Sequence, residues 1–432
     1  MLYPTRTTQN SQPGSRRPAA GPQRRRRAGA LILLAVCLPF LLGPAVPAVA
    51  AEPLDTEFFL GPPFELQEVT SFVLMEAHTG QILAARNANK PLGPASLTKI
   101  MTLKLALEAL EAGTLTLEET ALVSEKAWRT GGSKMFVLVD SRVTIRDLLY
   151  GIAVSSGNDA AVVLAEHLAG DEAAFVQRMN ERARQLGLEN TVFKNAHGLP
   201  APGQMTTALD MARLARAFVR DHPEALTIMS TRAFTYQPPR APQPITQYNR
   251  NGLLWKDPRV NGLKTGHTRE AGYHLVATAE EGEMFLIAVI MGAAGQNEAA
   301  GSRRREAAAS KLLDYGFRNF RTRVLDWTRV VEPELRVWKG RQNSVRLTTT
   351  EPTRVTYVAG REEALEIRRE VPPSVDAPIE KGARLGTLTI AQGGKVLRQF
   401  DLVAAEAVAR GSFFKVLLDA LRQFLARLFS GE

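Results

Sequence analysis

The chain has 432 residues, which is enough for two or three domains, and a formal net charge of +10. Seven of its 54 basic residues are arginines within residues 1–50, which contain no acidic residue; the remainder holds 47 basic and 44 acidic residues and does not predict a nucleic-acid partner. The single cysteine, Cys37, lies in the same leader, and the six histidines show no metal-ligand spacing, so disulfides, thiol catalysis, a bound metal and other cofactors are not expected.

Residues 1–50 have the pattern of a secretory signal peptide with a basic leader. Four arginines, Arg24 to Arg27, precede an apolar run over residues 28–43, and Ala48-Val49-Ala50 supplies a small-x-small cleavage site. A retained membrane anchor is the alternative, but about 16 apolar residues are fewer than the roughly 20 that a spanning helix needs. We therefore expect cleavage after Ala50.

The next segment predicts a β-hairpin followed by a helix. Residues 66–86 alternate around a His78-Thr79-Gly80 turn, and a loop over residues 89–95 leads to strong helix formers from Ser96 to Glu111. Ser96 is then an N-cap or first-turn residue, and Lys99 lies one turn further along on the same face.

The middle of the chain predicts helices that flank an antiparallel sheet. A turn over residues 155–158 interrupts the helical pattern, and a second turn at residues 280–283 joins two strands. The expected helices are 145–154, 159–168, 171–186 and 297–315, and the expected strands are 273–278 and 284–291. This arrangement predicts an α+β fold for residues 62–320.

Residues 322–404 predict a small all-β domain. Alternating segments there are separated by turns rich in Pro and Gly. The expected strands are 330–337, 344–349, 353–358, 365–369 and 386–391.

Residues 411–430 predict an amphipathic helix. Apolar residues recur every three or four positions from Phe413 to Phe429, opposite a charged face. We expect this helix to lie on a membrane surface, with packing against the β domain or against another chain as the alternative.

Three short strings carry the chemistry. They are Ser96-Leu97-Thr98-Lys99, Ser156-Gly157-Asn158 and Lys264-Thr265-Gly266. The first pattern alone is weak, since Ser412-Phe413-Phe414-Lys415 repeats it by chance in the terminal helix. The ordered set is specific, because Ser-x-x-Lys, Ser-x-Asn and Lys-Thr-Gly together characterise enzymes with an active-site serine and a lysine base.

The residue types assign a role to each position. Ser96 is the expected nucleophile, and Lys99 removes its proton only when neutral, so the site must lower the pKa of Lys99. A second ammonium from Lys264 and partial burial are expected to lower it. Ser156 can relay a proton to the leaving amine, and Asn158 can hold either a substrate amide or Lys99.

Residues 261–268 predict a strand edge to which an extended peptide can add. Gly266 allows close backbone approach, and the N–H groups of Ser96 and His267 are expected to form an oxyanion hole. The His267 side chain itself can be merely structural. Candidate ligands for a substrate carboxylate are Thr265, Thr268 and Arg269.

Residues 62–320 resemble the low-molecular-mass penicillin-binding proteins, specifically the serine-type D-alanyl-D-alanine carboxypeptidases. The strings that carry the resemblance are residues 94–102, 155–160, 193–199, 262–268 and 271–273. The β domain and the terminal helix also look like the family's stalk and membrane attachment. Lys134, within a segment similar to the family's loop near the active site, is a local departure of undefined role.

The resemblance implies a penicillin-binding/β-lactamase-like fold and a definite reaction. Ser96 would attack the carbonyl between the last two D-alanines of a peptidoglycan stem peptide, and water would hydrolyse the acyl-enzyme. β-Lactams would acylate the same serine. The enzyme would act outside the cytoplasm, on the outer face of the cytoplasmic membrane.

Three alternative functions share these motifs. A class A β-lactamase needs an additional glutamate for deacylation, and no Glu-x-x-Leu-Asn occurs between Ser156 and Lys264. A transpeptidase or endopeptidase of the same fold differs only in the acceptor or in the bond that is cleaved. A wall-peptide-binding sensor without turnover has no need of a lysine base, so the intact motifs disfavour it.

Overall fold

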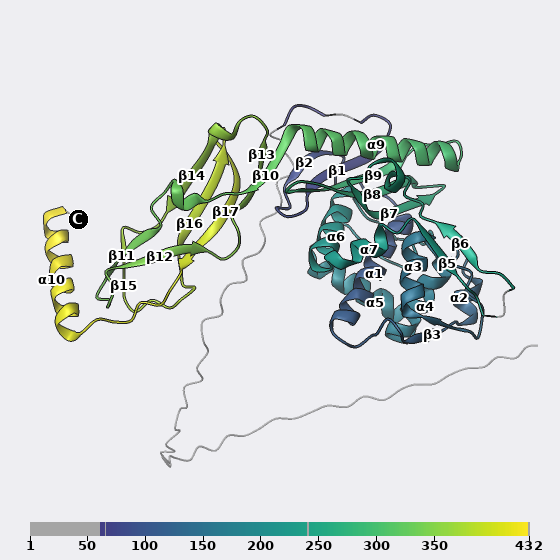
Figure 1. The fold of residues 1–432 in the computed structure, drawn as a ribbon, viewed down its shortest axis with the longest axis horizontal. Helices are drawn as coiled ribbons and strands as arrows, with labels where there is room; N and C mark the ends of the chain where they lie inside the picture. The colour runs from purple at the N-terminus through teal and green to yellow at the C-terminus, as the bar shows by residue number, and fades with distance from the viewer. Residues whose placement is uncertain (1–60, 65, 240–241, 431–432) are drawn as a thin grey trace, which may run out of the picture. The chain divides into compact units, whose positions relative to one another are not determined.

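The computed structural model describes residues 61–64, 66–239 and 242–430, with side chains up to residue 425 (Figure 1). The predicted signal peptide at residues 1–50 lies outside the described residues. Within the described part of the chain, no helix combines the length and apolar character needed to cross a membrane.

Residues 66–319, here called the helix–sheet region, are built on a five-stranded antiparallel sheet of order β2-β1-β9-β8-β7. The strand bounds are β1 Ser71–Glu76, β2 Ile82–Arg86, β7 Val260–Thr268, β8 Gly272–Glu281 and β9 Met284–Ala293. The strand that carries Lys264-Thr265-Gly266 is therefore at the sheet edge, as predicted.

Helices cover both faces of this sheet (Figure 1). Alternate side chains of β1 enter different cores: Phe72 and Leu74 pack with α9, Glu298–Asn319, whereas Val73 and Met75 pack with the helices on the opposite face. Those helices are α1 Lys99–Glu111, α3 Ile145–Val154, α4 Asn158–Ala169, α5 Glu172–Gln185 and α6 Ala208–Asp221. This layering confirms the predicted α+β class.

Shorter elements connect the main layers of the helix–sheet region. They are β3 Thr120–Leu122, α2 Glu125–Arg129, β4 Arg142–Thr144, η2 Pro223–Ala225, α7 Leu226–Met229, β5 Ala233–Tyr236, β6 Ile245–Tyr248 and α8 Leu253–Lys256. The sequence patterns above predicted neither these elements nor α6. Most are too short to show a periodic pattern.

The helix predicted from Ser96 begins later than expected. Residues Ala95–Thr98 form a 3₁₀ turn, η1, and the α-helix begins at Lys99. Ala95 has a positive φ of 47°, so the chain turns sharply just before Ser96. Ser96 is consequently neither an α-helical N-cap nor in the first α-helical turn.

Residues 320–410, here called the β region, contain a two-stranded sheet, β10-β13, and a six-stranded sheet of order β14-β16-β17-β12-β11-β15. The elements are β10 Phe320–Val324, η3 Trp327–Arg329, β11 Glu334–Trp338, β12 Ser344–Thr349, β13 Arg354–Val358, η4 Glu362–Ala364, β14 Leu365–Glu370, β15 Ser374–Asp376, β16 Arg384–Gln392 and β17 Lys395–Ala404.

Two sequence predictions in the β region were incomplete. The strand expected at residues 330–337 begins only at Glu334, because η3 precedes it and Pro333 lacks the N–H that a strand ladder needs. The strands β10, β15 and β17 were not predicted, although β17 pairs with both β16 and β12.

The terminal helix, α10, runs from Phe413 to Ser430. Asp419 is fully buried and accepts a hydrogen bond of 2.8 Å from the backbone N–H of Lys339 in the β region. The apolar face is open: Phe413 and Phe414 are 76% and 80% exposed. The helix thus touches the β region through a polar residue and leaves its larger apolar side chains exposed, namely Phe413, Phe414, Leu417, Leu418, Leu421, Phe424 and Leu425.

Candidate active site

The three motifs meet around one cavity of about 330 Å³. Seven of the residues selected from the sequence line it: Ser96, Ser156, Asn158, Thr265, Gly266, His267 and Thr268. The two lysines do not line it, because Lys99 is fully buried and Lys264 is 2% exposed. The fold therefore brings together residues that lie up to 172 positions apart in the chain.

Lys99 is held beside Ser96 by three oxygen atoms. Its Nζ lies 3.1 Å from Ser96 Oγ, 2.6 Å from Asn158 Oδ1 and 2.6 Å from the carbonyl oxygen of His197. The last two atoms only accept hydrogen bonds, so a neutral amine directs both of its hydrogens to them. Its lone pair is then left facing the Ser96 hydroxyl, which is the orientation a base requires.

Burial, and then the positive charge of Arg250, lowers the pKa of the Lys99 amine to about 7, although the nearby Asp159 carboxylate raises it in part. The sequence analysis expected the ammonium of Lys264, together with partial burial, to lower the pKa of Lys99. In the structure, Lys264 is not among the causes of the Lys99 shift. Burial and then the charge of Lys99 instead hold the pKa of Lys264 well below its ordinary value. Desolvation is thus the main cause at both amines.

The second motif lies where α3 ends and α4 begins. Ser156 adopts a positive φ of 60°, and its buried Oγ has no hydrogen-bond partner among the described residues. Asn158 uses both ends of its amide: Oδ1 accepts from Lys99, and Nδ2 donates to the Gly131 carbonyl at 2.7 Å. Asn158 therefore holds Lys99 and a loop, rather than presenting a free amide to the cavity.

The third motif brings the edge strand β7 against the Ser96 turn. A Cβ atom added at Gly266 would lie 3.2 Å from both the Ala95 Cβ and the Ser96 nitrogen, so a side chain here would crowd the nucleophile. The His267 ring stacks on Tyr273 with ring centroids 3.9 Å apart. Thr268 Oγ1 accepts from the Ala271 N–H at 3.0 Å and so stabilises the turn after the strand.

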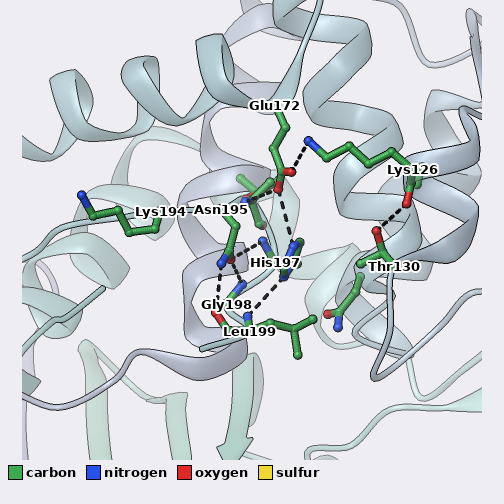
Figure 2. A network of polar contacts seen from close by, with 12 residues as sticks. Lys126, Thr130, Glu172, Lys194, Asn195, His197, Gly198 and Leu199 are labelled. Atoms are coloured by element: carbon green, nitrogen blue, oxygen red, sulfur yellow. Dashed lines mark hydrogen bonds and ion pairs between the residues drawn. The ribbon is translucent and has the colours of Figure 1, made fainter. Parts of the chain in front are cut away.

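A polar network supports the carbonyl that Lys99 uses (Figure 2). Glu172 accepts from the Ala196 N–H at 3.0 Å and forms an ion pair of 2.7 Å with Lys126. Asn195 Oδ1 accepts from the N–H groups of His197 and Gly198. The turn over residues 195–199 is thereby fixed from two sides.

The His197 side chain belongs to the same network. Its Nδ1 accepts from the Leu199 N–H at 3.2 Å, so Nε2 carries the hydrogen and lies 3.5 Å from Glu172 (Figure 2). Burial, and then the charge of Lys99, lowers the pKa of His197 to about 4. Gly198 follows with φ of +90°, and a Cβ there would lie 1.8 Å from the Ala95 oxygen. The turn is thus packed directly against the residue before Ser96.

The buried carboxylate of Asp159 holds the loop over residues 131–137, which contributes Gly132 and Ser133 to the cavity. Asp159 accepts from the backbone N–H groups of residues 135, 136 and 137 at 2.8–3.3 Å. Ser133, which lines the cavity, is tied to Asn158 through its carbonyl. Lys134 turns away: its amine donates to the Trp128 carbonyl, and Lys134 does not line the cavity.

Two arginines of the cavity were missed by the sequence analysis. Arg250 and Arg305 line it, and Arg305 donates to the Arg250 carbonyl at 3.2 Å. Arg269, the candidate named from the sequence, does not line it. Neither Arg250 nor Arg305 belongs to a sequence motif. Arg305 lies in a predicted helix, which indicated its secondary structure but not its place in the cavity.

Comparison with known proteins finds a family match for the helix–sheet region and another for the β region. The D-alanyl-D-alanine carboxypeptidase family profile matches residues 62–295, and the profile of the penicillin-binding protein 5 C-terminal domain matches residues 329–410. Among curated proteins, the chain is 37% identical to D-alanyl-D-alanine carboxypeptidase DacF of Bacillus subtilis, covering 81% of this chain and 88% of the relative. It is 39% identical to DacC of Escherichia coli, covering 82% and 87%.

Solved structures agree. Penicillin-binding protein 5 from Haemophilus influenzae matches with a TM-score of 0.74 and 37% identity, covering 81% of this chain and all of that chain. The Streptomyces K15 DD-transpeptidase matches with a TM-score of 0.53 and 28% identity, covering 59% and 99%. The predicted penicillin-binding-protein fold is thereby confirmed. The chain belongs to the family of serine-type D-alanyl-D-alanine carboxypeptidases.

Proposed function

We propose that the chain removes the terminal D-alanine of peptidoglycan stem peptides with Ser96 as nucleophile and Lys99 as general base. The observation that carries these roles is the placement of Lys99: a fully buried amine with a pKa of about 7, 3.1 Å from Ser96 Oγ, whose other two neighbours are carbonyl oxygens. A general base works best with a pKa near the working pH.

The reaction proceeds in two stages. Lys99 takes the Ser96 proton while Ser96 Oγ bonds to the carbonyl carbon of the penultimate D-alanine. The C–N bond then breaks, and the departing amine of the terminal D-alanine receives a proton through Ser156, whose Oγ has no other partner among the described residues. Water, deprotonated by the same base, hydrolyses the ester and releases the trimmed peptide.

The remaining cavity residues bind the peptide. The N–H groups of Ser96 and His267 stabilise the oxyanion, and Gly266 lets the peptide approach β7 closely. Thr265 and Arg250 receive the terminal carboxylate at the cavity wall, together with Arg305, while the Lys264 amine is buried next to the Thr265 carbonyl. Thr268 lies at the upstream end of the bound peptide, and Asn158 contributes indirectly, by holding the Lys99 amine in place. A β-lactam acylates Ser96 by the same path.

The test uses residues 51–432 and a diacetyl-Lys-D-Ala-D-Ala peptide. We expect release of free D-alanine from the unchanged protein and none above background from Ser96→Ala. The Ser412→Ala variant is the matched control, because Ser412 begins the chance Ser-x-x-Lys string on the exposed helix. Equal release from Ser96→Ala would overturn the proposal, and so would absence of labelling by a fluorescent penicillin.

Transpeptidation is a second candidate, supported by the likeness to a protein titled DD-transpeptidase. It differs only in that an amine, instead of water, attacks the acyl-enzyme. Adding glycine or a D-amino acid to the assay distinguishes the two: an exchange product exceeding free peptide indicates transpeptidation, whereas its absence supports hydrolysis.

We further propose that the protein works outside the cytoplasm, on the outer face of the cytoplasmic membrane, with α10 lying on the bilayer. The described Phe and Leu side chains of α10 are exposed while its Asp419 is buried, which supports a helix whose apolar face is free for lipid. Flotation with anionic liposomes tests this. Deleting residues 411–432 should abolish binding, and unchanged binding would contradict it.

A further inference from the structure

One acidic side chain in the catalytic cavity takes no part in the proposed reaction. Among the described residues that line the cavity, Glu298 carries the only carboxylate, and it shares the wall with Arg250 and Arg305. Its Oε1 lies 3.9 Å from Nη1 of Arg250, and both of these side chains are exposed to solvent. The arginine that we expect to receive the substrate's terminal carboxylate therefore already has a carboxylate partner within the protein.

The helix α9 holds both members of this pair. Glu298 lies in its first turn, and Arg305 follows seven residues later, on the same face. Arg305 Nη2 donates to the Arg250 carbonyl at 3.2 Å, and Glu306 accepts from the Gly252 N–H at the same distance. The backbone of Arg250 is thereby fixed against the helix that carries Glu298, so the approach of the two side chains follows from the packing of α9.

The charge of Glu298 also acts on the other groups at this end of the cavity. Burial lowers the pKa of both His267 and Arg305, and the negative charge of Glu298 opposes that shift at each of them. A substrate carboxylate that is held by Arg250 and Arg305 lies in the same field. Because like charges repel, Glu298 disfavours the group that the two arginines attract.

We propose that Glu298 is a specificity-determining residue that weakens binding of the substrate's terminal carboxylate by competing for Arg250. The substrate carboxylate must either displace Glu298 from the arginine or share the arginine with it, and both cost free energy. Released D-alanine retains the same carboxylate, so the competition also favours its departure. The inference rests on the proposed function, because it assumes a stem peptide whose terminal carboxylate lies at Arg250. It adds the residue that sets the affinity for that group.

The experiment measures KM and kcat for diacetyl-Lys-D-Ala-D-Ala in three variants of residues 51–432. Glu298→Gln should lower KM about two- to fivefold, the range of an exposed ion pair, with a smaller change in kcat. Glu298→Lys should lower KM further, whereas Glu298→Asp, which keeps the charge, should retain a KM closer to that of the unchanged protein. Raising the salt concentration should reduce the difference between Glu298→Gln and the unchanged protein.

The matched control is Glu118→Gln, which removes an exposed carboxylate paired with Arg146 at 2.6 Å, outside the catalytic cavity, and should keep KM. A purely structural role of Glu298 at the N-terminus of α9 predicts a lower melting temperature for Glu298→Gln without a lower KM, and that result overturns this inference. An equal fall of KM in Glu298→Asp or in Glu118→Gln overturns it as well.

Failure of the proposed function gives a different result. Absence of Ser96-dependent D-alanine release in the unchanged protein would overturn the proposed function, whereas normal release with an unaltered KM in Glu298→Gln overturns the role of Glu298 alone. Labelling by a fluorescent penicillin confirms that each variant is folded.

Discussion

The helix–sheet region and the β region differ in the kind of polar side chain that they bury. The helix–sheet region buries ionisable side chains, namely Glu76, Lys99, Lys104, Asp159, Glu172, His197, Asp210, His222, Lys264, His274, Arg305 and Glu306. Among the described residues of the β region, the buried polar side chains are neutral: Thr322, Thr353, Thr356, Thr389 and Gln392. Because burying a charge costs free energy unless it is paired, this difference marks where chemistry is maintained.

The buried lysines of the helix–sheet region fall into two groups, according to whether their partners are charged. Lys104 forms ion pairs with Asp221 at 2.8 Å and Glu108 at 3.1 Å. Among the described residues, Lys99 and Lys264 have only uncharged hydrogen-bond acceptors. We infer that an unpaired buried amine is catalytic and a paired one is structural. The predictions below test this distinction, beginning with the largest effect on acylation.

Lys99→Arg should reduce the rate of acylation by penicillin by about 10²- to 10⁴-fold, the usual contribution of a general base. Arginine keeps the positive charge but does not lose its proton in proteins. Time-resolved labelling by a fluorescent penicillin measures the rate, with a melting curve as the control for folding. A rate within tenfold of the unchanged protein would remove Lys99 from the base role.

Acidification should slow acylation about 100-fold between pH 8 and pH 5. The base is active when neutral, and the Lys99 pKa of about 7 leaves it mostly protonated below that pH. The rate should therefore fall about tenfold per pH unit below 7 and level off above 8. A rate constant that is flat from pH 5 to 8 would show that Lys99 does not titrate in this range.

Lys104→Met should leave acylation within about twofold while lowering the free energy of unfolding by about 1–3 kcal/mol. The loss stays moderate because Asp221 and Glu108 are partly exposed and keep Arg220 and Arg182 as partners. Lys264→Met is the contrasting change and should suppress acylation. If both variants lost acylation equally, pairing would not separate structural from catalytic lysines.

Leu388→Ala, in the core of the β region, should leave acylation unchanged although it lowers the free energy of unfolding by about 2–5 kcal/mol. Urea unfolding and penicillin labelling measure the two effects on the same sample. Thr348→Ala, at an exposed position of β12, is the control and should change stability by less than about 0.5 kcal/mol. Slower acylation in Leu388→Ala would show that the β region contributes to the site.

The sequence by itself determined the layers and the motif residues. Long helices such as α5 and α9 were predictable because one face of each is buried and the pattern repeats several times. The strands β8 and β9 were predictable as short apolar runs bounded by a turn, because both of their faces are buried. The three strings identified Ser96, Lys99, Ser156 and Lys264 because their order and their residue types are specific to one chemistry.

Only the tertiary structure decided how the lysine is made a base. The carbonyl of His197, the Glu172 network behind it and the Arg250–Arg305 pair lie in different segments, and a backbone carbonyl leaves no signature in side-chain identity. Desolvation of Lys99 depends on every group packed around it, whereas a local pattern records only neighbours in the chain. The 3₁₀ turn at Ser96 could not be predicted for the same reason. It packs closely against Gly198 and Gly266, which are distant from it in the sequence.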